Sequence, residues 1–105
     1  MPSERFWRDA SGRLTFDMDR VEAVDYPTIC RAVADKFDLV PEGLLVVGLD
    51  QMFWDFRQGD QVIALDWDIW MGFMVAAKSE GAELLVRDIA AWLDSSWQIG
   101  AGECG

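Results

Sequence analysis

The sequence contains no histidine, and this absence removes several classes of active site. Ser-His-Asp and Cys-His nucleophilic systems need a histidine, as do the usual histidine-containing zinc sites, and histidine is the commonest general base. The chain also lacks a GxxxxGK[ST] or GxGxxG phosphate-binding loop. Carboxylates alone can hydrolyse glycosides, but such enzymes usually need a larger cleft than a small domain supplies. We therefore expect a protein that is not an enzyme and binds no cofactor.

Long apolar runs and a cysteine framework are also missing. The longest uncharged apolar stretch, residues 69–77, is far too short to cross a bilayer, and the first twelve residues carry charges where a signal peptide needs an apolar core. Cys30 falls on a predicted helix and Cys104 in the last three residues, so no disulfide pattern is recognisable. We expect a cytoplasmic protein with reduced thiols and no membrane contact.

Basic residues are scarce, with 9 Lys and Arg against 19 Asp and Glu, for a net charge of -10. Between Phe37 and Ala77 the only basic residue is Arg57. A field of this sign repels nucleic-acid phosphates and anionic membranes, and it attracts basic proteins or cations. Nucleic-acid binding is therefore disfavoured, whereas a role in simple solubility and a charge-matched partner both remain open.

The size and composition are those of one folded domain, because 105 residues with 51% hydrophobic content suffice for a single core. Residues 1–94 should form this domain. Residues 95–105, SSWQIGAGECG, contain three glycines and few anchoring side chains, which predicts a loosely ordered C-terminal tail.

Two segments have the apolar spacing of helices. The first begins at Asp25-Tyr26-Pro27, where Asp is a favoured N-cap and Pro suits the first turn, and the second begins after Ser79 and runs to about Asp94. Strands are predicted at residues 6–8, 14–18, 44–49, 52–57, 62–69 and 73–78. The order β-β-α-β-β-β-β-α predicts an α+β two-layer sandwich, with an antiparallel sheet of about four to five strands and both helices on one face.

Two of these strand predictions are more specific. Residues 40–43 fit a type I turn that leads into residues 44–49, a run without alternation that is typical of a strand covered on both faces or at the sheet centre. Gln58-Gly59-Asp60-Gln61 fits a type II′ hairpin, because Gly59 can adopt the positive φ that the first central position requires.

The hairpin register decides which side chains share a face. It places Phe56 opposite Ile63, Trp54 opposite Leu65, and Met52 opposite Trp67, with all six directed to the core. Because strand side chains alternate, Phe53, Asp55, Asp66 and Asp68 are then expected on the outer face.

The three aspartates on this face have several interpretations. They can be the solvated side of a strand, where charges prevent edge-to-edge aggregation, or a patch that faces a partner. Divalent cations take oxygen ligands, so Asp55, Asp66 and Asp68 are also a candidate metal site. A pair of nearby carboxylates doing acid–base work is a further reading.

Aromatic residues favour the partner-facing patch. The chain is tryptophan-rich, with six, and Trp70 lies in a turn at the end of the acidic strand, where an exposed aromatic is a typical interface anchor. Trp70 and Phe53 can instead be covered by the N-terminal hairpin or the tail. We interpret the chain as an inhibitor-like or immunity-like protein-interaction module that presents Phe53, Asp55, Asp66, Asp68 and Trp70 to a basic protein. The alternative is a divalent-metal or small-ligand domain built on the same aspartates, and a homodimer is left open.

Overall fold

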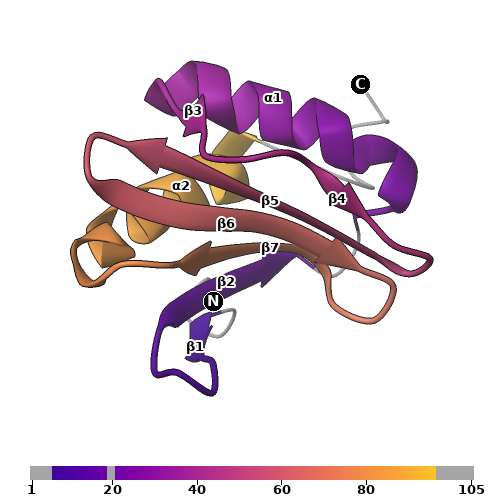
Figure 1. Cartoon of the computed structure of the whole chain (residues 1–105), viewed down its shortest axis with the longest axis horizontal. Coiled ribbons are helices and arrows are strands. Elements are labelled where there is room, and N and C mark those ends of the chain that lie inside the picture. The colour runs from indigo at the N-terminus through magenta and orange to yellow at the C-terminus, as the bar shows by residue number, and fades with distance from the viewer. Residues whose placement is uncertain (1–5, 19–20, 97–105) are drawn as a thin grey trace.

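A computed structural model of the chain describes residues 6–18 and 21–96 (Figure 1). Its elements in chain order are β1 (Phe6–Arg8), β2 (Leu14–Met18), the 3-10 turn η2 (Ala23–Asp25), α1 (Tyr26–Phe37), β3 (Val40–Pro41), β4 (Val46–Val47), β5 (Gln51–Gln58), β6 (Gln61–Asp68), β7 (Gly72–Ala77), the 3-10 turn η3 (Glu80–Ala82) and α2 (Glu83–Ser96). The strands form one sheet in the order β1-β2-β7-β6-β5-β3, and β4 also pairs with β5. All of its strand pairs are antiparallel.

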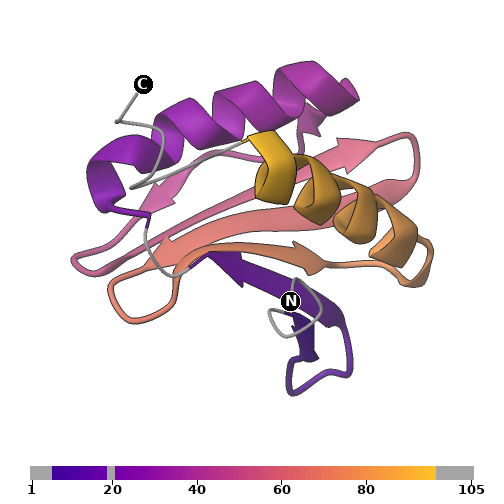
Figure 2. The same cartoon turned by 180° about the vertical axis from the view of Figure 1, so that it is seen from behind.

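The predicted α+β class with both helices on one face of the sheet is confirmed. Figure 2 shows α1 and α2 on the side of the sheet that is turned away from the viewer in Figure 1. The strand count is larger than predicted because the edge beside β5 is made of two separate pairings, β3 and β4, of two residues each. Within the described residues, no helix is long and apolar enough to cross a membrane.

The core lies between the sheet and the two helices. Alternate residues of β6, namely Ile63, Leu65 and Trp67, are buried there, as the hairpin register predicts. They pack with the apolar stripes of α1 and α2 and with the inward residues of β2 and β7, such as Ile29, Val33, Val86, Ile89, Leu93, Phe16, Phe73 and Val75. Tyr26 at the start of α1 is also buried and donates a hydrogen bond from its hydroxyl to the Leu65 carbonyl.

The β5–β6 hairpin has the predicted register over all eight residue pairs, from Gln51 opposite Asp68 to Gln58 opposite Gln61. Gly59 has a φ of 62°, which is the left-handed conformation that the turn requires. Local chemistry at one glycine therefore fixes which side chains of two long strands face outward.

The prediction for residues 40–49 is wrong. Val40 and Pro41 form β3 instead of opening a type I turn, and residues 44–49 contribute only the short edge strand β4. Leu44, Val46, Val47 and Leu49, which we name the edge strip, are exposed instead of covered. A proline in β3 agrees with edge placement, because proline cannot donate to a ladder and is confined to edges.

The boundary of the predicted tail also needs correction. Ser95 and Ser96 belong to the last turn of α2, so the helix extends two residues beyond the predicted end of the domain at residue 94. Residues 97–105, with Trp97 and Cys104, lie outside the described residues. Ser79 precedes η3 and makes no side-chain cap, and α2 proper begins only at Glu83.

Candidate functional site

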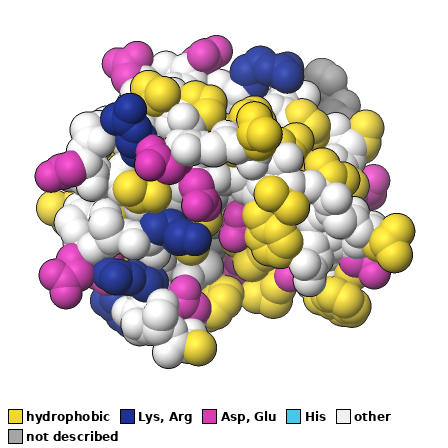
Figure 3. All heavy atoms as spheres, in the orientation of Figure 1, with side chains coloured by type: hydrophobic (Ala, Val, Ile, Leu, Met, Phe, Trp, Pro, Cys, Tyr) yellow, Lys and Arg dark blue, Asp and Glu magenta, His cyan; other side chains and the backbone are white. Residues whose placement is uncertain are grey.

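Among residues 6–18 and 21–96, no helix covers the outer side of the sheet, which faces the viewer in Figure 1. We name this side the open face, and its outward side chains on β5, β6, β7 and the residue after β7 are Gln51, Phe53, Asp55, Arg57, Val62, Ala64, Asp66, Asp68, Met74, Ala76 and Lys78. Figure 3, in the same orientation, shows acidic and basic side chains lying among exposed apolar ones on this face. The predicted outer placement of Phe53, Asp55, Asp66 and Asp68 follows from the confirmed register.

The two predicted aromatic anchors are exposed within the part of the chain that the structure describes. Phe53 is 41% exposed and Trp70 is 72% exposed. Trp70 lies in the turn between β6 and β7, next to the exposed Ile69. Neither ring is therefore buried in the core, and both are accessible to another molecule.

Asp68 has a local structural role. Its Oδ1 accepts hydrogen bonds from the backbone N–H groups of Trp70 (2.9 Å) and Met71 (2.6 Å). A carboxylate that bonds the backbone two and three residues ahead is a common way to close a turn. Asp68 thus holds the turn that displays Trp70, and it does not join the other two aspartates in one site.

Asp55 and Asp66 line a hollow of about 260 Å³ beside the edge strip. Its other lining residues are Glu42, Gly43, Leu44, Val46, Phe53, Trp54 and Lys78. The sheet register brings Asp66 directly opposite Phe53 and places Asp55 one pair further along β5, opposite Ala64. Phe53 in turn lies opposite Val46 of β4, so two apolar side chains stand beside the carboxylates.

Several charges of this region are already paired. The Lys78 Nζ lies 3.6 Å from Asp55 Oδ2, and the Arg57 Nε lies 2.8 Å from Glu42 Oε1. The Trp54 indole N–H donates to the Gly43 carbonyl at 3.0 Å and ties the loop before β4 to β5. The hollow therefore has a fixed rim with charged groups at defined positions.

Asp66 is the exception among these charges. Its Oδ1 is enclosed and has no hydrogen-bond partner among the described residues. Burial raises the pKa of Asp66 to about 6, with the Asp55 and Asp68 charges adding to the increase, while the Trp54 backbone amide and Lys78 lower it. A carboxyl group with a perturbed pKa in a surface hollow is a candidate functional group.

The candidate metal site at Asp55, Asp66 and Asp68 receives no support from this geometry. In residues 6–18 and 21–96, no three Asp, Glu or Cys side chains are grouped so that they could hold a metal ion. The reason is visible in the contacts, because Asp55 pairs with Lys78 and Asp68 bonds the turn.

Sequence reasoning missed Lys78, Glu42 and the edge strip as neighbours of the aspartates. Lys78 continues the alternation of Met74 and Ala76, so its face follows from parity along the predicted strand 73–78. The signals for the edge strip were Pro41 before it and Gly43 and Gly48 around it, since such residues interrupt central strands.

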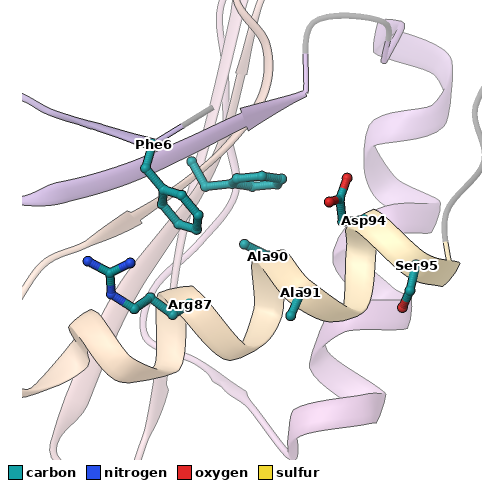
Figure 4. Close-up of a pocket in the computed structure, with 7 residues that line it drawn as sticks. Phe6, Arg87, Ala90, Ala91, Asp94 and Ser95 are labelled. Atoms are coloured by element: carbon teal, nitrogen blue, oxygen red, sulfur yellow. The ribbon is translucent and has the colours of Figure 1, made fainter. Parts of the chain in front are cut away.

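A second hollow, of about 350 Å³, lies on the helix side of the sheet between α2 and the β1–β2 hairpin. Figure 4 shows Phe6 and Arg87 toward one end, Asp94 and Ser95 toward the other, and Ala90 and Ala91 between them. The Arg87 guanidinium lies 5.3 Å from the centroid of the Phe6 ring, which is a cation–π arrangement. None of the residues predicted as a site lies in this hollow.

Comparison with protein-family models, with curated proteins and with solved structures finds no significant match to this chain.

Proposed function

We propose that this protein is a non-enzymatic protein-interaction module that binds a basic protein partner through the open face and the edge strip. The observation that carries the proposal is the juxtaposition, in one hollow, of the exposed apolar side chains Leu44, Val46 and Phe53 with Asp66, whose Oδ1 has no hydrogen-bond partner among the described residues. Trp70 adds a further exposed aromatic ring in the turn at the end of β6. Exposed apolar and aromatic groups that lie together mark interaction surfaces, and aromatic side chains are frequent energetic anchors.

The charge of the chain supports a basic partner. The net charge is -10, and Arg57 is the only basic residue between Phe37 and Ala77, a range that includes the turn at Trp70 and every lining residue of the hollow except Lys78. Electrostatic complementarity of this kind accelerates association and rejects partners of like charge. A second copy of this chain is disfavoured for the same reason, because two such surfaces would repel each other.

The carboxylates support recognition better than catalysis. Asp55 forms an ion pair with Lys78, and Asp68 accepts hydrogen bonds from the backbone of the turn. Asp66 is half-buried, and its Oδ1 has no hydrogen-bond partner among the described residues. Acid–base chemistry by carboxylates ordinarily uses a pair in distinct roles. Binding of a cationic group needs only one carboxylate. The free, buried thiol of Cys30 fits a cytoplasmic setting, where thiols stay reduced.

The test is affinity capture followed by measurement on the purified pair. The captured protein should be basic, and its Kd should rise steeply between about 50 and about 300 mM salt because exposed charges are then screened. The variant Asp55→Asn/Asp66→Asn should weaken binding by about tenfold or more. The matched control Asp35→Asn/Asp88→Asn removes the same charge from the exposed surfaces of α1 and α2 and should bind normally.

A second pair of variants, one test and one matched control, examines the apolar part of the surface. Trp70→Ser should weaken binding by about tenfold or more, as loss of an aromatic anchor typically does. Leu84→Ser is the control, because Leu84 on α2 is 73% exposed, as Trp70 is at 72%, but lies away from the open face. Equal binding by both variants, or affinity independent of salt, would contradict the proposed function.

A further inference from the structure

We propose that the hollow beside Asp66 is a subsite for one arginine side chain of the basic partner, an inference that rests on the function proposed above. Its volume of about 260 Å³ is below the range of about 300 to 1,000 Å³ that is usual for cofactor and small-molecule pockets. One long side chain inserted from a partner surface matches this size better.

The walls of the hollow suit the aliphatic part of such a side chain. Leu44 and Val46 of the edge strip lie on one side, and the Phe53 ring stands between them and the carboxylates. Arginine and lysine lay their methylene stems along apolar surface while the charged head reaches a polar group. Because Leu44 and Val46 are largely exposed in the free protein, covering them adds apolar burial to the electrostatic gain.

The charged groups of the lining select a cation. Of the three carboxylates in the lining, Glu42 is paired with Arg57 and Asp55 with Lys78, which leaves the charge of Asp66 without a basic partner there. Asp66 Oδ1 is enclosed and lacks a hydrogen-bond partner among the described residues, so no donor there offsets the charge of the carboxylate, and the Asp66 side chain lines the hollow. The Lys78–Asp55 distance of 3.6 Å is longer than a hydrogen bond, which leaves Asp55 able to accept a further donor.

Two features favour arginine over lysine. A guanidinium is planar and carries five N–H donors, so it can bond two carboxylates at once, whereas an ammonium acts as a point charge. The exposed ring of Phe53 directly opposite Asp66 offers a flat surface on which a guanidinium can stack. The pairing of Arg57 with Glu42 at the rim shows that a guanidinium is accommodated beside this edge of the sheet.

The direct test uses the full chain and N-acetyl-arginine amide as the probe, followed by ¹H–¹⁵N NMR at about pH 7.5, where Asp66 is ionised. We expect saturable shifts in the millimolar range for the amides of Phe53, Asp55, Asp66 and Lys78 and for the Trp54 indole N–H. N-acetyl-citrulline amide, which has the same shape without the charge, should cause no shift. N-acetyl-lysine amide should bind about threefold or more weakly.

Two variants and a control test whether the arginine probe binds in the hollow beside Asp66. Asp66→Asn should weaken the arginine probe by about tenfold, and its spectrum reports at once whether the fold is intact. Lys78→Gln frees Asp55 from its ion pair and should strengthen binding by about threefold. Asp88→Asn, with the same loss of charge on α2, should leave binding unchanged.

The outcomes separate this inference from the proposed function. Absence of shifts around the hollow, equal shifts with the citrulline probe, or unchanged binding by Asp66→Asn overturns the arginine subsite. If that happens while a basic partner still binds in a salt- and Trp70-dependent manner, the proposed function stands without the subsite. Arginine binding without any salt-sensitive basic partner overturns the proposed function and leaves a cation site alone.

Discussion

Replacement of Asp66 by Asn should stabilise the protein near neutral pH. Burial raises the pKa of Asp66 from 3.8 to about 6, so the folded state binds this proton more tightly than the unfolded state does. The stability contributed by protonated Asp66 is fully present below about pH 4 and is lost as the pH rises through 6. At neutral pH the buried charge therefore opposes folding, and an uncharged side chain of the same shape removes this penalty.

The size of the effect follows from the shift. Two pKa units correspond to about 3 kcal/mol, since one unit is about 1.4 kcal/mol. The side chain retains some contact with solvent and the Asn amide needs partners of its own, so we expect a net gain of about 1 kcal/mol at about pH 7.5. For a chain of this length, that corresponds to a rise in Tm of about 4–8 °C.

Urea unfolding followed by tryptophan fluorescence measures this difference at about pH 7.5 and again at about pH 4. The advantage of Asp66→Asn over the natural sequence should be present at the higher pH and vanish at the lower one. Asp88→Asn, at an exposed position on α2, should show no such pH-dependent difference. An Asp66→Asn variant that is less stable than the natural protein at pH 7.5 would refute the argument that the buried charge lowers the free energy of unfolding.

Three further predictions concern the scaffold. In a Cys104→Ser variant, the native protein should not react with a thiol reagent at about pH 8, because burial raises the pKa of Cys30 to about 12, and one thiol should react after denaturation. Tyr26→Phe should lower the free energy of unfolding by about 1 kcal/mol in urea titrations, since it removes the buried hydrogen bond to the Leu65 carbonyl. Gly59→Ala should cost about 1 kcal/mol in the same measurement, although nothing crowds the position, because φ is 62° there.

The parts of the fold that sequence predicts well are those fixed by local interactions. Gly59 determines the turn, the turn determines the register of β5 and β6, and the register places Phe53, Asp55 and Asp66 outward. A one-residue slip would have turned Trp67 outward and Asp66 into the core, so the apolar pattern and the turn chemistry specify the same pairing.

The parts that sequence does not predict depend on distant neighbours. A run of apolar residues such as 44–49 has the same sequence pattern at the centre of a sheet and along its edge. Its edge position is seen only from the structure, where β4 pairs with β5 on one side. The raised pKa of Asp66 is similarly invisible in the motif Asp-Trp-Asp, because it arises from burial on a face shared with β5 and β7. Asp68, two residues away, meets the turn backbone instead.

The edge strip and the acidic charge are best understood together. An exposed apolar sheet edge is a hazard, because unpaired backbone groups and apolar side chains invite pairing with another copy of the chain. Here β3 and β4 are only two residues long, and Glu42 and Asp50 lie on either side of the edge strip. Two copies that approach along this edge would bring like charges together, whereas a basic partner would neutralise them. Under the function proposed above, the same charges would discourage self-association and attract a basic partner, which would cover the exposed apolar side chains.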